Sequence, residues 1–355
     1  MGQKRPAQLA RGATLAVALS LLGLFLLLRL TGGRAAWPSL ARLNPMLVAL
    51  SIGLVVVNWL FDALRMVVLV HALGGRLRLL SAMRISVLGA FVANVTPFDS
   101  GGEPLQAYLL TDKGITVGQS TAVIAVKTIL NAFARLCLGI IIPGWLMISR
   151  AQWHLPAGMN VALTIGLSAY FAFFVLSLVF IAKPELVRVI VVPLLRNRLV
   201  SRFVRPEQVD KALDFVDRSV REFRSALQVF IRDSKLALIT VLLLSFAGWL
   251  TVISIPALLL IGFGMHPSYA EVMGIAIIFY LASAYAPTPG SSGAAELGFA
   301  VLFSTIVPVR LLAMFVAVWR LLTYYLTLAV GGIMVGLGVV RQRPKPREQE
   351  RGCAS

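Results

Sequence analysis

The chain has 355 residues, of which 58% are apolar and only 14% are charged, and its formal net charge is +18. A soluble domain is about half apolar and roughly a quarter charged, so this composition excludes a soluble enzyme and indicates a polytopic membrane protein. Two cysteines are too few for a disulfide framework or a four-cysteine zinc site, and the three histidines lie far apart with no ligand spacing, so we expect no metal and no cofactor.

Six apolar runs are long enough to cross a bilayer, which requires about 20 helical residues. In chain order they cover residues 13–30, 45–70, 120–147, 159–181, 236–263 and 311–340. The first run resembles a signal peptide in its basic flank, but Thr31-Gly32-Gly33-Arg34 is an unconvincing cleavage site. We therefore predict an all-α protein with about six full spans, the first of them retained.

Two further apolar segments end in helix-breaking sequences. Residues 84–95 lead into a break at 96–103, and residues 268–285 lead into a second break at 286–293. Proline and clustered glycine interrupt a helix, and the arm after each break has about 8 to 13 residues, too few to cross about 30 Å. The sequence therefore predicts two re-entrant helical hairpins in addition to the full spans.

The two breaks share a Thr-Pro-x-x-Ser-Gly motif, at residues 96–101 and 288–293. In each case a glutamate beyond the motif precedes, by 24 residues, a cation embedded in the next span. The two pairs are Glu103 with Lys127 and Glu296 with Arg320. The shared motif and equal interval indicate an internal repeat, which we place at about residues 79–147 and 268–340.

The positive charges predict the orientation of the chain. Of 33 Lys and Arg residues, roughly 24 fall in connections that one topology places on a single side, which the positive-inside rule makes cytoplasmic. Both termini are then cytoplasmic, and the two hairpins enter the inner membrane from opposite sides. Paired, interrupted helices in inverted repeats indicate a transport site at the bilayer midplane. Anionic headgroups explain the basic surface without nucleic acid.

The insertion at residues 183–235 is hydrophilic, and its apolar residues from Val209 to Phe230 recur at alternating steps of four and three. This pattern predicts an amphipathic helix that either lies on the inner leaflet or forms half of a coiled coil. We expect residues 1–345 to form one integral membrane domain, and residues 346–355 to be a disordered basic tail attracted to anionic lipid.

The four repeat charges lie roughly 15 to 21 Å from the nearest membrane surface at 1.5 Å per helical residue. An isolated charge at such a depth costs at least about 2.5–3.5 kcal/mol, so we expect Glu103 to pair with Lys127 and Glu296 with Arg320. Two interpretations remain open. The pairs are structural clamps between hairpin and span, or they line a cavity in which an anionic group competes for the cations.

Other embedded polar residues are predicted to act locally. Asp62 and Arg65 can pair at i,i+3 spacing, and Arg65 alternatively snorkels to the surface. Arg135 either extends a cationic track from Lys127 or snorkels. Packing hydrogen bonds within the hairpins are the expected role of Asn94, Asn131, Gln106 and Tyr280. The candidate substrate-binding or translocation residues are Glu103, Lys127, Glu296, Arg320, Gln106, Thr96, Asp99, Thr288 and Arg135.

Three segments, residues 96–108, 287–296 and 320–325, resemble signatures of the flippase-like, lysylphosphatidylglycerol-synthase transmembrane-region family. Ser291 stands where relatives usually have glycine, and Val126-Lys127 replaces an acidic–arginine pair, which argues against a proton relay in that span. Few residues follow the last span, so we expect no fused aminoacyltransferase. The resemblance implies the membrane part alone, with lipid translocation and not lipid synthesis.

The expected function is movement of a phosphate-bearing lipid, phospholipid or polyprenyl-phosphate-linked, between the leaflets. In this hypothesis Lys127 and Arg320 meet the headgroup phosphate, while Glu103 and Glu296 gate the path or take up protons. A lipid-remodelling enzyme would need a nucleophile–base or metal constellation, which the sequence does not display. The remaining alternative is a non-transporting accessory subunit that partners a membrane lipid or envelope biosynthesis enzyme.

Overall fold

The computed structural model describes residues 43–149, 157–186, 206–283 and 288–337, with a few further positions between 17 and 40. Throughout these ranges the regular secondary structure is helical, which confirms the predicted all-α membrane protein. Most of the predicted first span and the basic tail lie outside the described residues.

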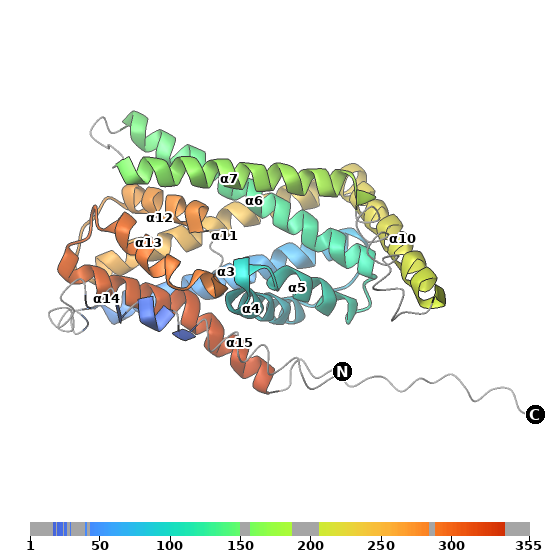
Figure 1. The fold of residues 1–355 in the computed structure, drawn as a ribbon, viewed down its shortest axis with the longest axis horizontal. Helices are drawn as coiled ribbons and strands as arrows, with labels where there is room; N and C mark the ends of the chain where they lie inside the picture. The colour runs from blue at the N-terminus through green and yellow to red at the C-terminus, as the bar shows by residue number, and fades with distance from the viewer. Residues whose placement is uncertain are drawn as a thin grey trace, which may run out of the picture.

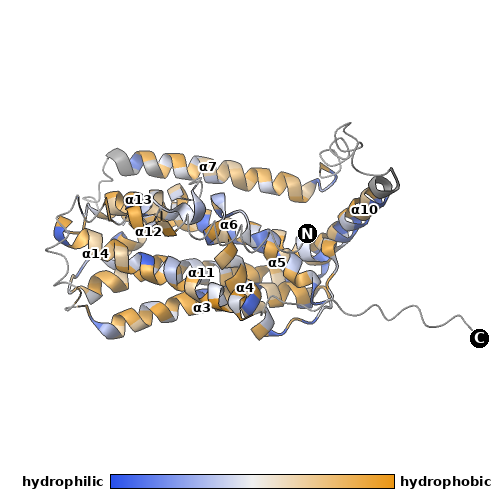
Figure 2. Ribbon diagram, turned by 60° about the horizontal axis from the view of Figure 1, so that its bottom comes forward, coloured by the Kyte–Doolittle hydropathy of each residue, from blue (hydrophilic) through white to orange (hydrophobic). Residues whose placement is uncertain are grey.

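Five of the predicted spans form helices long and apolar enough to cross a membrane. They are α3 (Pro45–Ala72), α6 (Val117–Ser149), α7 (Ala157–Ala182), α11 (Lys235–Gly262) and the run α14 (Val309–Arg320), η5 (Leu321–Tyr325) and α15 (Leu326–Gly336). Figure 1 shows these long helices lying along a common axis, which we take as the membrane normal. Their residues are mainly apolar in Figure 2, as lipid contact requires.

Local sequence explains where several of these helices begin and bend. Asn44 caps α3 by accepting a hydrogen bond from the backbone N–H of Met46 at 2.9 Å, and Pro45 occupies the first helical position. The last span changes to a π-helical turn directly after Arg320. Such turns inside α-helices occur frequently at functional sites.

Both predicted hairpins form, each as helix, short 3₁₀ turn and helix. The first comprises α4 (Leu79–Val95), η2 (Pro97–Asp99) and α5 (Gly102–Thr111), and the second comprises α12 (Tyr269–Ser283), η4 (Pro289–Ser291) and α13 (Ala294–Phe303). Figure 1 shows α4 and α5 toward the end of the bundle that carries α10, and α12 and α13 toward the other end. The η2 and η4 turns contact each other.

The backbone of the two turns is nearly identical. Phe98 has φ 56° and ψ 21°, and its counterpart Gly290 has φ 57° and ψ 26°. The next residues, Asp99 and Ser291, also have positive φ angles of 53° and 54°. Three of these four residues are not glycine and carry a steric cost of about 1–2 kcal/mol each, so the shared shape is held by the surrounding structure.

The insertion contains the predicted amphipathic helix, α10 (Pro206–Gln228). Its C-terminal apolar residues, Phe223, Ala226 and Leu227, are buried, and Glu222 Oε2 accepts a hydrogen bond from the backbone N–H of Gly118 at 3.3 Å. The helix therefore packs against the start of α6 at one end of the bundle (Figure 1). At least part of its apolar face is covered by protein.

The core around the second hairpin is rich in aromatic side chains. The rings of Phe299 and Trp319 stack with centroids 3.8 Å apart and planes 7° from parallel. Phe299 also stacks on Phe303 at 4.2 Å, and Phe279 meets Trp319 edge-on at 5.4 Å. These contacts fix α12, α13 and α14 to one another directly beside Arg320.

Candidate functional site

A buried cluster of charged side chains is centred on Asp62 of α3. Its Oδ1 atom accepts hydrogen bonds from Arg65 Nη2 at 3.1 Å and from Lys127 Nζ at 2.9 Å. Its Oδ2 atom accepts from Ser86 Oγ at 2.6 Å and from Gln106 Nε2 at 3.2 Å. Asp62 thus connects α3, α4, α5 and α6, and the predicted Asp62–Arg65 pair is confirmed.

The two cations of this Asp62 cluster are almost enclosed, with 7% of each side chain exposed. Arg65 Nη1 donates to Asn131 Oδ1 at 2.6 Å and to Ser245 Oγ at 3.3 Å, so it binds inside the bundle and does not snorkel. Lys127 Nζ also donates to Gln106 Oε1. Two cations share one carboxylate, so the Asp62 cluster has one excess positive charge.

The predicted pairing of Glu103 with Lys127 is wrong. Glu103 is exposed, and its Oε1 atom accepts a hydrogen bond from Thr128 Oγ1 at 2.8 Å. Gln106, one helical turn further along α5, is buried and takes the place expected for the glutamate. It fits because Gly89 of α4 has no side chain; a Cβ atom there would lie 2.5 Å from Gln106 Nε2.

The second predicted pair, Glu296 with Arg320, is confirmed. Arg320 Nε lies 2.7 Å from Glu296 Oε1, the glutamate is fully buried, and 6% of the arginine side chain is exposed. Glu296 Oε2 accepts from the backbone N–H of Gly293 at 2.6 Å and so caps α13. Arg320 Nη2 donates to the carbonyl oxygen of Gly290 at 3.2 Å. This Glu296 pair is neutral overall and ties the turn η4 to the last span.

Side chains that the sequence did not single out complete this pair. Ser20 Oγ donates to Glu296 Oε1, and Tyr325 Oη donates to Ser20 Oγ at 2.8 Å. The Arg320 guanidinium carbon lies 4.5 Å from the ring centroid of Tyr324, within the range of a cation–π interaction. The hydroxyl-to-carboxylate contact joins the predicted first span to the second hairpin.

Tyr324 also joins the two hairpins. Its hydroxyl donates to the carbonyl oxygen of Asn94 at 3.4 Å and accepts from Ser292 Oγ at 3.4 Å. On the first break, Thr96 Oγ1 accepts from the backbone N–H of Gly101 at 2.9 Å. Thr96 therefore closes its own turn, while the Tyr324 hydroxyl holds the two turns together.

Arg135 lies between two aromatic rings and does not snorkel. Its guanidinium carbon is 4.6 Å from the ring centroid of Tyr170 on α7 and 4.6 Å from that of Trp249 on α11. Trp249 Nε1 donates to the carbonyl oxygen of Asn131 at 3.2 Å. Asn131 also binds Arg65, so two hydrogen bonds and one cation–π contact link the Asp62 cluster to Arg135. The cationic track from Lys127 stays a prediction.

The remaining two candidates lie on the breaks. Asp99 is exposed at the end of η2, within electrostatic range of the guanidinium groups of Arg135 and Arg320. Thr288 precedes η4, and its Oγ1 atom is buried without a hydrogen-bond partner. The structure thus brings charged groups of both hairpins and of α6 toward the place where η2 meets η4.

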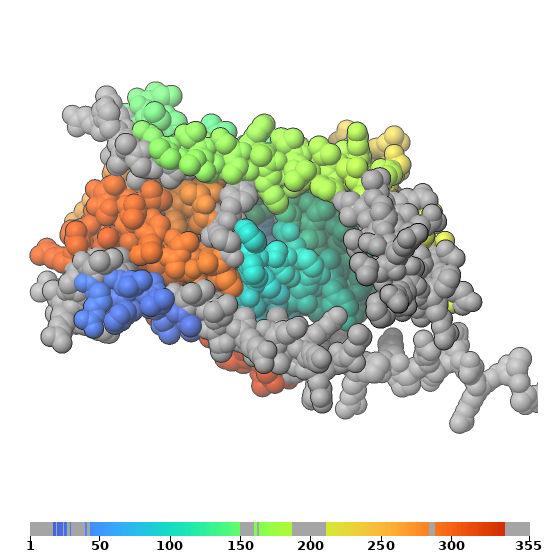
Figure 3. Space-filling view, viewed as in Figure 1, coloured from blue at the N-terminus to red at the C-terminus, as the bar shows by residue number. Residues whose placement is uncertain are grey.

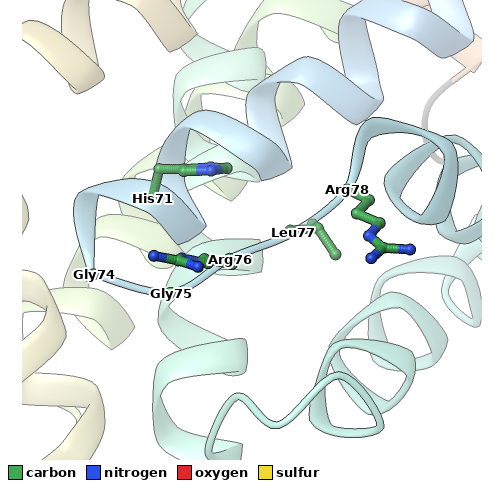
Figure 4. Close-up of a pocket in the computed structure, with 6 residues that line it drawn as sticks. All are labelled: His71, Gly74, Gly75, Arg76, Leu77 and Arg78. Carbon is green, nitrogen blue, oxygen red and sulfur yellow. The ribbon is translucent and has the colours of Figure 1, made fainter.

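The molecular surface is recessed beside these elements. In Figure 3 a hollow lies below α7, beside the cyan-coloured first hairpin. A separate shallow pocket at the turn between α3 and α4 (Figure 4) is lined by His71, Arg76 and Arg78. That pocket is basic and lies at the end of the bundle. We therefore relate it to the anionic membrane surface and not to the site formed by the buried charges.

The described residues hold no group of three or more His, Cys, Asp and Glu side chains that could bind a metal ion. The buried charged groups of these residues are arginine and lysine side chains, with one carboxylate in the Asp62 cluster and one in the Glu296 pair. Such a set attracts and orients an anion through hydrogen bonds.

Comparison with known proteins covers both hairpins and both charged clusters. Residues 13–331 match the family described as the lysylphosphatidylglycerol synthase TM region. A protein of Archaeoglobus fulgidus, described as a UPF0104 membrane protein, is 26% identical over 329 residues, which is 90% of this chain and 94% of that protein.

Proposed function

Because this chain belongs to the lysylphosphatidylglycerol synthase transmembrane-region family, we propose that it moves a phosphate-bearing lipid between the leaflets of the inner membrane. The lipid is a phospholipid or a polyprenyl-phosphate-linked lipid, and the protein performs no lipid synthesis itself. The observation that carries the proposal is the buried excess of positive charge in the Asp62 cluster, which adjoins one of two broken helical hairpins.

The charge excess supports binding of an anion within the bundle. A cation in the membrane interior without a counter-charge costs at least about 2.5–3.5 kcal/mol. Arg65 and Lys127 share the single carboxylate of Asp62, so a lipid phosphate near them would supply the missing negative charge. The contacts through Asn131 and Trp249 link these two cations to Arg135, and we propose that the phosphate passes along them.

The hairpins support a site near the bilayer midplane. Both are interrupted by the same left-handed turn, and the two turns contact each other between the ends of the bundle. Broken helices in inverted repeats commonly form transport sites at this depth. We propose that residues 79–147 and 268–340 are such repeats, entered from the cytoplasm and from the opposite side respectively, with both termini cytoplasmic.

We propose different tasks for the two charged clusters. Arg65 and Lys127 attract the phosphate, because their cluster has the unbalanced charge. Glu296 accepts hydrogen bonds from Arg320, Gly293 and Ser20, so it holds the second hairpin in place. That Glu296 gates the path or takes up protons stays a prediction.

A second candidate function follows because the buried carboxylates are fully hydrogen-bonded. Every oxygen of Asp62 and Glu296 has a partner, as in a structural clamp. The chain would then be a non-transporting accessory subunit of a membrane lipid or envelope biosynthesis enzyme.

Reconstitution separates the two candidates. We expect wild-type protein in liposomes to move labelled phosphatidylglycerol or a labelled polyprenyl phosphate across the bilayer, and Lys127→Gln to slow this by about tenfold or more, since a charge-assisted hydrogen bond contributes about 1.5–3 kcal/mol. Lys113→Gln is the matched control, because Lys113 is exposed at the end of the first hairpin. Movement of neither lipid by the wild type would favour the accessory role.

A further inference from the structure

Arg135 is a cation that the Asp62 cluster and the Glu296 pair do not involve. Its Nε atom is buried without a hydrogen-bond partner among the described residues, and its guanidinium group contacts the rings of Tyr170 and Trp249. Both ring centroids lie 4.6 Å from the guanidinium carbon. The Nε–H group, which has no such partner, is left to bind an oxyanion.

Asp99 supplies the nearby negative charge. It lies at the end of η2 with a φ of 53°, a left-handed conformation that costs energy in any residue other than glycine. The side chain is exposed, yet it is within electrostatic range of both Arg135 and Arg320. Strained backbone conformations of this kind cluster at binding and switching sites.

Thr288 provides a further unsatisfied group on the facing turn. Its buried Oγ1 atom has no hydrogen-bond partner, and it directly precedes η4, which contacts the η2 turn that carries Asp99. A buried hydroxyl without a partner loses about 1–3 kcal/mol relative to a satisfied one. A bound phosphate oxygen would satisfy it.

We propose that Arg135 binds the phosphate of a phosphodiester lipid, and that Asp99 is the counter-ion that this phosphate displaces. The proposal rests on the proposed function only in requiring that a lipid headgroup reaches the interior. Arginine suits the task because its planar guanidinium group can hold two phosphate oxygens at once. The Tyr170 and Trp249 rings act as positioning residues that keep this plane fixed.

The charges of the interior narrow the class of lipid. The charged side chains joined to one another by ion pairs or electrostatic interactions in this region are Asp62, Arg65, Asp99, Lys127, Arg135, Glu296 and Arg320. Glu103 is left out of this set because it is exposed and bound to Thr128. Four members of the set are cations and three are carboxylates, which leaves one positive charge unbalanced. A headgroup with one net negative charge, such as phosphatidylglycerol, balances it, whereas a zwitterionic headgroup or a doubly charged phosphomonoester does not.

Binding can be measured through the ring that touches Arg135. The full chain is purified in detergent and titrated with dihexanoyl-phosphatidylglycerol while tryptophan emission is recorded, with Trp249→Phe to identify the responding residue. We expect saturable binding, weakened about tenfold or more in Arg135→Gln and several-fold in Arg135→Lys, which keeps the charge but loses the fork. Asp99→Asn should bind several-fold more tightly, because the competing carboxylate is gone.

Controls separate this proposal from its alternatives. Arg310→Gln removes an exposed arginine and should leave binding unchanged, and dihexanoylglycerol, which lacks phosphate, should not bind. Equal binding by wild type, Arg135→Gln and Asp99→Asn would overturn the proposal even if lipid movement is observed. Inorganic phosphate binding as tightly as the lipid would overturn the assignment to a lipid. Binding that depends on Arg135, without transbilayer movement, would refute the proposed function and leave this inference standing.

Discussion

The two hairpins have the same turn and opposite charge arrangements. In the second, Glu296 lies within the hairpin, pairs with Arg320 and caps its own helix, so the charges cancel. In the first, the equivalent Glu103 is on the surface and Lys127 takes its carboxylate from α3. The same turn therefore occurs in two different charge environments. We infer that the second hairpin is a fixed support and that the first provides the charge for binding.

Neutralising the glutamate of each hairpin should therefore give the largest difference in the free energy of unfolding. Glu296→Gln leaves the buried Arg320 without its counter-charge and should lower the free energy of unfolding by about 3–5 kcal/mol. Glu103→Gln keeps an oxygen acceptor for Thr128 and removes only an exposed charge, so it should change the free energy of unfolding by less than about 1 kcal/mol. Equilibrium unfolding in mixed micelles measures both. Equal losses in the two variants would remove the distinction between the hairpins.

Substitutions at Gly290 and at its counterpart Phe98, the second residues of the two turns, should also change the free energy of unfolding to different extents. A Cβ atom on Gly290 would lie 2.4 Å from Tyr324 Cε2 and 2.7 Å from the carbonyl oxygen of Asn94. Gly290→Ala should therefore destabilise the protein by about 2–4 kcal/mol through overpacking and backbone strain. The same unfolding measurement applies, and a near-neutral result would mean that the two turns do not pack as tightly as the structure indicates.

Replacing Phe98 of the first turn by glycine should have the smallest effect on the free energy of unfolding. Phe98 is exposed and left-handed, so Phe98→Gly relieves about 1–2 kcal/mol of steric cost but increases the freedom of the unfolded chain by a comparable amount. We expect a net change within about 1 kcal/mol, read from the unfolding midpoint. A loss as large as that of Gly290→Ala would show that the Phe98 ring itself supports the site.

The hairpins and the Glu296 pair could be predicted from sequence because their signals are local. Proline and glycine mark each break, and Glu296 and Arg320 follow it at a fixed interval. The same interval failed for Glu103, because spacing along the chain does not determine how a helix is rotated against its neighbours. Gln106 is buried and Glu103 is exposed. This rotation of α5 is possible because Gly89 of α4 has no side chain where Gln106 packs.

Contacts between distant segments could not be predicted at all. Lys127 finds its partner at Asp62, and the Arg135 guanidinium is fixed by rings from α7 and α11. Asp62 and Arg65 did give a signal, as charges within an apolar span, but their local pairing concealed that both also reach α6. Only the packing of the helices decides which of several embedded charges meet.

The central claim is that the unbalanced positive charge of the Asp62 cluster carries a lipid phosphate across the membrane. The most direct measurement compares the rate of phosphatidylglycerol movement in liposomes for wild type, Lys127→Gln and the double variant Asp62→Asn with Lys127→Gln. The single change cancels the excess charge, and the double change restores it through Arg65. We predict loss of movement in the single variant and substantial recovery in the double variant; equal rates in all three would contradict the account.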